Sequence, residues 1–528
     1  MTGRSVTFGG TSYPVVLPTL RDPRLHVAVV TLSVHVLGQV GLGFRLSVPQ
    51  ILAAMLTCVV IEVAITFRQT RSFVWPASAM LTGSGVALIL RVVGTPLGDH
   101  WSTYAWYVYA GVAGLALLTK YVIRYHGQQV FNPSNVGLVV AFLVLGSERV
   151  EPLDFWWAPL DGWMLAAYAV IVVGGMLITR RLHLLAMAVT FWVSFTVGLG
   201  ILAGSGHCMT ANWAFAPVCG TDFVRVLATS PEVMIFVFFM VTEPRSVPPS
   251  RVGRVVFGWL VAVMCTLLIA PQTNEFGTKV GLLAGLTVLC AARPILDRVL
   301  PESRSAADGF GRFATRLVTG GNAGIGAFRR VARVGLIVAV VLSLGVGVVV
   351  AGTPARGQTA PDTAALLAGV PHAIDPATLP TITVNVPAWD ETIAAPIAQG
   401  ILVTLGEDLE LENQALLRSD GSLLVAVDHG DRLKEMQGRL ADAVSSGKAT
   451  IAHYRFDSVH VVVIAPFGVQ TGGSIGFESA GTVTQETYDA TGTLLDRQTS
   501  PFALTFAVRR PTAARWMIVA VLPPGAAG

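Results

Sequence analysis

The sequence predicts a polytopic α-helical membrane protein, a ten-helix bundle plus one extra transmembrane helix, that is followed by a soluble α+β domain. Of its 528 residues 53% are hydrophobic and only 13% are charged, and the mean hydropathy is +0.63. Soluble domains carry roughly 25% charged residues, so a wholly soluble or disordered chain is excluded. Charge is divided along the chain: residues 353–528 hold 18 acidic and 11 basic side chains, whereas residues 1–352 hold 14 and 25. A basic membrane part is therefore expected to precede an acidic polar part.

Apolar runs define the membrane part, because a spanning helix needs about 20 mostly apolar residues. An eleventh run at 334–352 follows ten earlier ones and a basic connector at 301–333. The fifth and eighth runs are short, so we expect broken or partly embedded helices whose backbone groups are satisfied by neighbouring helices. The ten earlier runs, which together form a membrane domain at 25–300, are 25–44, 48–67, 73–94, 101–123, 131–147, 162–179, 182–204, 230–241, 253–270 and 279–300.

Basic side chains predict the orientation of these helices. Every second loop contains Arg or Lys and the intervening loops are poor in both, and short basic loops stay on the cytoplasmic side. Residues 1–24 are therefore expected in the cytoplasm, and no cleavable signal peptide is expected there because the segment lacks an apolar core. The eleventh helix then carries a Pro- and Ala-rich tether at 353–395 and a domain at 396–528 to the outside.

Two of the five cysteines lie in a loop that this topology places outside. Cys208 and Cys219 share the loop between the seventh and eighth runs, and in an oxidising compartment they can form a disulfide. Unpaired thiols are an alternative, and so is a metal or redox pair, although the close spacing and His partners that favour such a pair are missing. We expect no metal site.

Ionisable residues inside apolar runs are costly and are candidates for function. His35 lies in the middle of the first run and Glu62 in the inner half of the second. If these two helices pack as an antiparallel pair, His35 and Glu62 can hydrogen-bond or relay a proton or ion. A polar pair that only locks two helices together is the alternative interpretation.

Three polar, glycine-containing or proline-containing clusters are unlike ordinary spans, and the topology assigns all of them to the cytoplasmic face. Small residues permit close backbone approach, and free N–H groups at a helix start suit an anionic or carbonyl-bearing ligand. Close helix packing would explain the small residues equally well. The clusters lie at residues 75–85, 131–137 and 238–245, and the residues we select as candidates for cofactor binding are Ser78, Thr82, Gly83, Phe131, Asn132, Pro133, Asn135, Thr242 and Glu243.

The order of these clusters resembles the membrane subunits of ion-motive redox complexes. These are the B subunit of the sodium-translocating NADH:quinone oxidoreductase and the D subunit of the Rnf complex, and the chain is most similar to their compact enediyne-biosynthesis-type branch. The resemblance rests on Ser78-Ala-Met-Leu-Thr-Gly83, Phe131-Asn-Pro133 and Phe239-Met-Val-Thr-Glu-Pro244. The family usually has Asp where Glu243 stands. The resemblance covers about residues 20–300 and implies ten spans, inside termini and a bacterial cytoplasmic membrane.

The resemblance also implies electron transport with a flavin or quinone. Family members with covalent FMN attach it to the Thr of a Ser-Gly-Ala-Thr motif in the outer loop between spans five and six. That loop, residues 147–161, contains neither Thr nor Gly here. We therefore do not expect covalent FMN through that threonine, whereas FMN, riboflavin or a quinone bound non-covalently is compatible with the sequence.

The C-terminal segment reads as α+β. Helices are predicted at 397–417 and 431–444, and strands at 459–465, 473–488, 501–509 and 515–521, with turns around 472–473 and 489–492. Helices followed by a long antiparallel sheet resemble the NTF2-like (SnoaL-like) fold. Asp428, His429, His453, His460 and Tyr488 are present, but their spacing is not typical of catalysis, so binding or assembly is the favoured role.

The leading functional hypothesis is an integral membrane subunit of an electron-transport complex, with the lipid bilayer, other redox-complex subunits or extracytoplasmic proteins as partners and no nucleic acid. Catalysis by this chain alone is not expected, because no dinucleotide-binding or iron–sulfur motif is present. The alternatives are a transporter or permease for a hydrophobic metabolite, for which broken helices are typical, and a membrane scaffold for an extracytoplasmic assembly domain.

Overall fold

A computed structural model divides the chain into two compact units. The first contains Met1–His207 and Gly220–Ala355, and the second contains Cys208–Cys219 and Arg356–Gly528. The boundary near residue 355 agrees with the division expected from charge. The structure describes the whole chain except residues 1–3, 9–10, 97, 148, 154–161, 212–213, 215–216, 302, 304, 306–307, 320–326, 354–377, 385–392, 465–472, 512–514 and 526–528.

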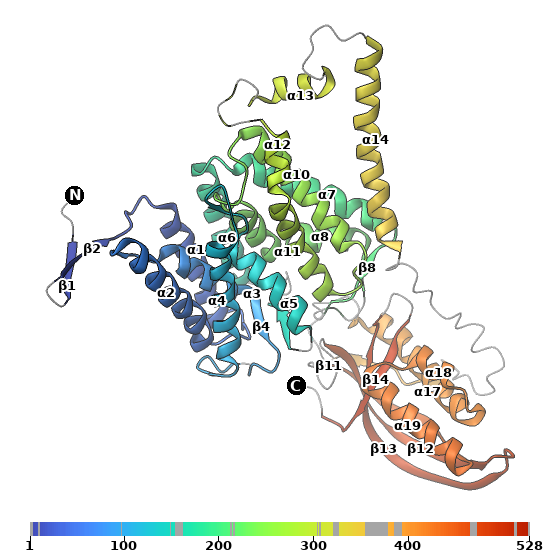
Figure 1. The fold of residues 1–528 in the computed structure, drawn as a ribbon. Helices are drawn as coiled ribbons and strands as arrows, with labels where there is room; N and C mark the ends of the chain where they lie inside the picture. Colours follow the sequence, from blue (N-terminus) through green and yellow to red (C-terminus); the bar gives the residue numbers. More distant parts are fainter. Residues whose placement is uncertain are drawn as a thin grey trace. The chain divides into compact units, whose positions relative to one another are not determined.

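The first unit is built from helices, which are coloured blue to yellow in Figure 1. They are α1 (Pro23–Val40), α2 (Val48–Thr70), α3 (Ala77–Ile89), α4 (Trp106–Val122), α5 (Pro133–Leu145), α6 (Gly162–Arg181), α7 (Leu185–Gly204), α8 (Gly220–Thr229), α9 (Pro231–Ile235), the π-helix η1 (Phe236–Val241), α10 (Arg251–Ile269), α11 (Glu275–Ala291), α12 (Arg293–Val299), α13 (Phe310–Thr319) and α14 (Ala327–Ala351).

A helix occupies each of the apolar runs, and the chain has several helices that could cross a membrane. Among the described residues five helices are long and apolar enough, or up to seven if each bent pair counts as one span. One bent pair is α8 with the continuous stretch Pro231–Val241, and the other is α11 with α12. The fifth run forms the short helix α5, and the eighth forms one continuous stretch of α9 and η1 that is bent relative to α8. The count of ten spans remains a prediction.

Local capping signals explain where several of these helices begin. Asp22, Ser47, Asn132, Ser230 and Ser250 stand at N-caps and accept hydrogen bonds from backbone N–H groups of the first turn. A proline follows within the first two positions in four of these cases, where its missing N–H costs nothing. Short side-chain oxygens followed by Pro are therefore reliable start signals in this chain.

Short strand pairs connect the helices of the first unit. The strands are β1 (Arg4–Phe8), β2 (Thr11–Val16), β3 (Phe73–Val74), β4 (Leu90–Val92), β5 (Arg124–Tyr125), β6 (Gln128–Gln129) and β7 (Val150–Pro152), paired as β1-β2-β3, β4-β7 and β5-β6. Strands β3 and β4 occupy parts of the third apolar run at its two ends. The helix of this run, α3, therefore has only 13 residues.

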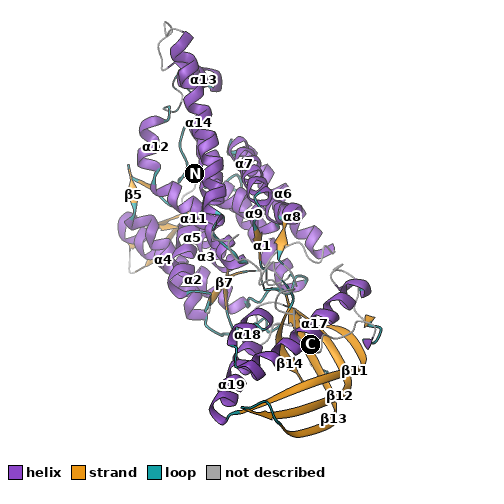
Figure 2. Ribbon diagram, turned by 90° about the vertical axis from the view of Figure 1, so that its right-hand side faces the viewer, coloured by secondary structure: helices purple, strands orange, loops and turns teal. Residues whose placement is uncertain are grey.

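The second unit contains the predicted C-terminal α+β domain. Its sheet has the order β10-β11-β12-β13-β14, antiparallel except for the β10–β11 pair, and Figure 2 shows its long curved strands. The elements are β10 (Thr383–Val384), α17 (Ala395–Arg418), α18 (Gly421–Val427), α19 (Gly430–Ser446), β11 (Lys448–Ile464), β12 (Ser474–Asp489), β13 (Leu494–Arg509) and β14 (Met517–Leu522).

The core of this domain lies between α17 and the sheet. Leu402 and Leu405 on α17 pack with Phe477, Phe506 and Ile518 from three strands, all nearly inaccessible to solvent. The positions of both predicted helices and all four predicted strands are confirmed. The helix α18 and the strand β10 were not predicted, and β11 begins about eleven residues before the predicted strand at 459.

The second unit also contains the loop between α7 and α8. Cys208 and Cys219 form a disulfide and lie opposite each other in the strand pair β8 (Cys208–Met209) and β9 (Val218–Cys219). Of the alternatives expected for these two cysteines, the disulfide is therefore confirmed, rather than unpaired thiols or a metal or redox pair. Arg509 at the end of β13 donates a hydrogen bond of 2.7 Å from Nη2 to the carbonyl oxygen of Ala211. This contact attaches the loop to the C-terminal domain.

Candidate functional site

Three helix starts of the first unit meet at one place. Asp22 caps α1 and accepts a hydrogen bond from the backbone N–H of Arg24, and Asn132 caps α5 by accepting one from the N–H of Asn135. Helix α3 begins after Pro76 and has no side-chain cap. The N-terminal ends of helices carry free N–H groups and partial positive charge. Their convergence produces a region that favours anionic or carbonyl groups.

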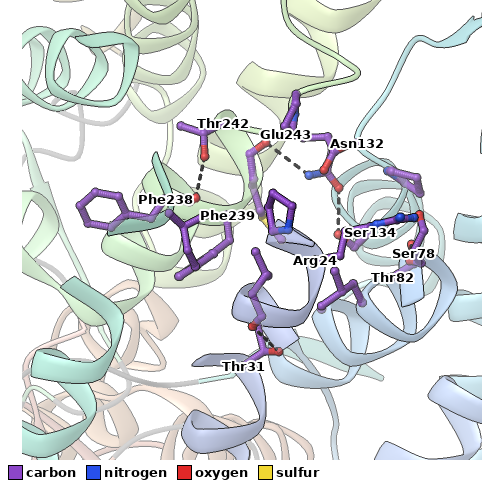
Figure 3. Close-up of a pocket in the computed structure, with 18 of the residues that line it drawn as sticks. Arg24, Thr31, Ser78, Thr82, Asn132, Ser134, Phe238, Phe239, Thr242 and Glu243 are labelled. Carbon is purple, nitrogen blue, oxygen red and sulfur yellow. Dashed lines mark hydrogen bonds between the residues drawn. The ribbon is translucent and has the colours of Figure 1, made fainter. Parts of the chain in front are cut away.

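These helix starts surround a cavity of about 330 Å³, within the range of small-molecule sites. All three clusters singled out from the sequence contribute to its wall, although they are more than 100 residues apart at the extremes. Figure 3 shows the labelled side chains around it. Its polar lining includes Asp22, Arg24, Thr31, Ser78, Thr82, Gln129, Asn132, Ser134, Thr242, Glu243 and Arg245, and its apolar lining includes Leu81, Leu88, Ile89, Ile178, Leu182, Ile235, Phe238 and Phe239.

Hydrogen bonds tie the second and third clusters together at this wall. The amide of Asn132 donates to the carbonyl oxygen of Met240, at 3.3 Å, and that of Gln129 donates to a carboxylate oxygen of Glu243, also at 3.3 Å. Met240 belongs to η1, and π-helical turns inside helices are frequent at functional sites because they redirect side chains. The wall of Phe238, Met240 and Glu243 is thus fixed against the start of α5.

Charged groups of both signs line the cavity. The guanidinium of Arg24 contacts the carboxylate of Asp22, with Nη2 to Oδ2 at 2.7 Å, and Arg245 follows Glu243. Burial raises the pKa of Glu243 above its ordinary value, against the opposing charge of Arg245. The ammonium of Lys120 lies 3.4 Å from the Ser78 hydroxyl. Cationic side chains and helix starts therefore accompany the apolar wall.

Most of the candidate cofactor-binding residues line this cavity, namely Ser78, Thr82, Asn132, Pro133, Thr242 and Glu243. Gly83 does not: a Cβ there would lie 2.7 Å from the Ala54 carbonyl oxygen, so this glycine permits α3 to approach α2. Asn135 also turns away, because its amide donates to Leu283 O at 2.9 Å and to Thr287 Oγ1 at 2.8 Å on α11. Phe131 precedes the Asn132 cap and is not among the lining residues.

Sequence reasoning missed the contribution of α1 to this wall. Arg24 and Thr31 line the cavity, but neither residue belongs to the motifs that resemble the redox-subunit family, so neither was predicted as a binding residue. The available signal was Asp22-Pro23, which has the same cap-and-proline pattern as Asn132-Pro133.

The expected pairing of His35 with Glu62 is wrong. His35 Nε2 forms a hydrogen bond with Ser84 Oγ at 3.1 Å, whereas Glu62 accepts two from Lys120 Nζ, at 2.8 and 3.0 Å, and another from the Tyr121 hydroxyl. The reason is packing: α1 lies against α3 and α6, while α2 lies against α3 and α4. Each residue therefore finds its partner on a different neighbouring helix.

A smaller cavity of about 50 Å³ adjoins the same helices and contains a buried lysine. Lys279 on α11 forms ion pairs with Glu275, at 2.7 Å, and with Glu232 on α9, at 3.0 Å. These residues are not among those predicted from the sequence, although a lysine at the start of an apolar run was a usable signal. Their mutual pairing explains how the charges are accommodated inside the unit.

The C-terminal domain encloses carboxyl groups that the sequence spacing did not reveal. Glu412 forms a two-pronged ion pair with Arg432, at 2.6 and 2.7 Å, and Asp408 pairs with Arg515. Asp428 is 1% exposed, and within the described residues its carboxyl group faces that of Glu412 and accepts no hydrogen bond from a donor. Burial and the neighbouring Glu412 raise the pKa of Asp428 to about 11. This side chain is therefore a neutral acid near pH 7.

The other polar residues noted in this domain make local pairs. His453 Nδ1 lies 3.4 Å from a Glu410 carboxylate oxygen, and the Tyr488 hydroxyl donates to Glu486 at 2.6 Å. His460 lies on β11 opposite Glu478 of β12, and His429 donates its backbone N–H to Ile518 O. Within the described residues no group of three or more His, Cys, Asp or Glu is placed to hold a metal ion.

The outer loop in which family members attach covalent FMN is only partly described. Residues 148 and 154–161 of this loop lie outside the described residues. No model of a protein family matches this chain, and no curated protein matches it either. The interpretation of the cavity therefore depends on its geometry and on the residues that line it.

Proposed function

We propose that this chain is an integral membrane subunit of an electron-transport complex and that it binds a flavin or a quinone non-covalently in the 330 Å³ cavity. One observation carries the proposal: three clusters, selected in the sequence for their ligand-binding chemistry, line a single cavity together with the starts of α1, α3 and α5. Packing alone would not require polar clusters from distant segments to face the same space.

The lining fits the chemistry of these cofactors. Leu88, Ile235 and Phe238 offer an apolar surface for a planar ring, and the hydroxyls of Ser78 and Thr82 and the amides nearby suit its carbonyl edge. The phosphate of FMN would be favoured by the helix starts and by Arg24 and Arg245. A bound flavin or quinone would supply the capacity to accept and release electrons. The raised pKa of Glu243 suits a group that holds a proton beside such a ligand.

The remaining features belong to the same proposal. A ten-span domain of the redox-subunit family is supported by helices at each expected run, and an NTF2-like assembly domain is supported by α17–α19 and the curved sheet. An extracytoplasmic position for that domain is supported by its attachment to the disulfide-containing loop through Arg509 and Ala211, because disulfides persist in oxidising compartments.

The first experiment is an absorption spectrum of the detergent-purified chain, followed by acid extraction and chromatography of any pigment. We expect a flavin or quinone that is fully extractable, either as purified or after incubation with FMN, riboflavin and ubiquinone. A chain that stays without cofactor after all these incubations contradicts the proposal.

A charge variant tests the assignment of the cavity. Removing an ionic hydrogen bond to phosphate costs about 1.5–3 kcal/mol, or roughly tenfold or more in Kd. Arg24→Gln should therefore raise the Kd of FMN at least tenfold and leave the Kd of riboflavin, which has no phosphate, nearly unchanged. The matched control is Arg225→Gln on α8, which removes an exposed Arg that pairs with Asp222 at 3.1 Å. Equal weakening of both flavins, or none of FMN, would place the ligand elsewhere.

A permease function remains the second candidate, favoured by the 42° bend between α8 and the Pro231–Val241 stretch that forms the wall of the cavity. Broken helices at substrate sites are typical of transporters. Flux of a hydrophobic metabolite into proteoliposomes that contain this chain alone, without bound flavin or quinone, would favour that function over electron transport.

A further inference from the structure

The connector before the last long helix contains an amphipathic helix, α13, at a place where the sequence predicts only a basic linker. At about 100° per residue, its apolar side chains occupy one continuous arc of about 140°. The opposite arc carries Gly311, Arg312, Thr315, Arg316 and Thr319. The apolar arc is formed by Phe310, Phe313, Ala314, Leu317 and Val318.

The apolar arc is only partly covered within the first unit: α13 contacts α14, and Phe313 and Val318 are half-buried. No residue of α13 is buried, and Phe310 and Leu317 are 54% and 50% exposed. Leaving large apolar side chains in water is unfavourable by about 25 cal/mol for each Å². An occupant that covers this arc would therefore stabilise α13.

The positive charge of the surrounding segment indicates that the binding partner of this arc is anionic. Between residues 309 and 333 the sequence contains five Arg and no Asp or Glu. Arg312 and Arg316, one helical turn apart, are both exposed on the polar arc. A helix with aromatic and aliphatic side chains on one face and Arg on the other lies in the plane of a membrane surface and is attracted by anionic lipids.

Chain connectivity keeps α13 close to a bilayer. Only residues 320–326 separate it from α14, and seven residues reach at most about 25 Å. Helix α14 is long and apolar enough to cross a membrane, and only 6% of its apolar window is buried inside the structure. If α14 spans the bilayer, α13 cannot move far from the headgroups.

We propose that α13 binds anionic phospholipid headgroups as an in-plane helix, with Phe310, Phe313 and Leu317 inserted below the headgroups and Arg312 and Arg316 contacting lipid phosphates. A lipid surface fits better than a protein partner because both arcs of the helix are then satisfied at once, and because the adjoining span supplies the surface. The inference is independent of the cofactor cavity.

The test uses the full chain in lipid nanodiscs made of phosphatidylcholine alone or with about one third phosphatidylglycerol. A fluorophore is attached to Leu317→Cys on the apolar arc or, as the matched control, to Thr315→Cys on the polar arc; the native free cysteines are buried. We expect quenching of the Leu317 probe by nitroxide lipids and protection from iodide in the anionic discs, while the Thr315 probe stays accessible to iodide.

The charge dependence separates lipid binding from simple burial. Each Arg near an anionic surface strengthens partitioning by about fivefold, so the double variant Arg312→Gln/Arg316→Gln should lower the ratio of inserted to exposed α13 by about 25-fold. About 1 M salt should weaken insertion as well, because it shortens the Debye length to about 3 Å. The control Arg455→Gln changes an exposed Arg of the C-terminal domain and should leave insertion unchanged.

Two outcomes would overturn the proposal. Equal iodide access for the Leu317 and Thr315 probes in both kinds of disc would show that the apolar arc stays in water. Protection of the Leu317 probe without quenching by nitroxide lipids, unchanged by lipid charge, would show that protein rather than lipid covers the arc. Both substituted positions are exposed, so neither change removes a core contact.

Discussion

Replacing Asp428 by Asn should stabilise the C-terminal domain, and by an amount that grows with pH. Asp428 is 1% exposed, and among the described residues its carboxyl group accepts no hydrogen bond from a donor. Its pKa is raised from 3.8 to about 11, chiefly by burial and then by Glu412. The folded chain therefore keeps this carboxyl protonated while the unfolded chain releases the proton above about pH 4.

The sign and size of the effect follow from this difference. Above pH 4 and below pH 11 the unfolded state is favoured further by about 1.4 kcal/mol for each pH unit. Between pH 5 and 7, Asp428→Asn should therefore gain about 2.7 kcal/mol in unfolding free energy relative to the unchanged chain. An amide in the same place has its own burial cost, but that cost does not depend on pH, so the slope is the quantity to measure.

The assay is urea unfolding of the full chain in detergent at several pH values, read by brief proteolysis and the surviving C-terminal fragment. Asp442→Asn on the exposed side of α19 is the matched control, because it makes the same chemical change where the side chain is not buried. A constant difference between the unchanged chain and Asp428→Asn across this pH range would refute the reasoning, as would a difference that shrinks as pH rises.

Two smaller changes test other contacts. Gly83→Ala would bring a Cβ within 2.7 Å of the Ala54 carbonyl oxygen and should lower stability by about 1–3 kcal/mol in thermal unfolding, whereas Gly111→Ala, with open space around it, should not. Glu410 raises the pKa of His453, so His453→Gln should cost about 0.5–1 kcal/mol at low pH and nothing once pH rises well above that pKa; a loss that persists at high pH would contradict this.

Much of the fold could be predicted from the sequence because it depends on local order. Apolar runs locate the helices, and alternating patterns between glycine turns locate the strands from Ser474 onward. Capping residues such as Ser47 and Asn132 fix where helices begin. The helix α13 was not predicted, because Arg and Gly interrupt its apolar residues along the sequence. The apolar residues form one continuous face only when they are placed on a helix.

The candidate site was only partly predictable. The sequence selected Ser78, Asn132 and Glu243 by residue type and order, and they do line one cavity. The sequence could not show that the side chain of Asn135 bonds to α11 or that Arg24 lines the cavity. Both facts depend on how α5 and α1 are rotated about their axes. Rotation is set by packing against neighbours that are distant along the chain.

The sequence by itself determined that the chain has an apolar helical part and a polar α+β part, because hydropathy, charge and turn residues act over a few positions. Only the tertiary structure decided which polar groups meet. His35 contacts Ser84 rather than Glu62, and Lys279 joins glutamates from two helices. The physical reason is that a buried charge or hydrogen-bonding group must be matched in three dimensions, and its partner is chosen by helix packing rather than by proximity in the sequence.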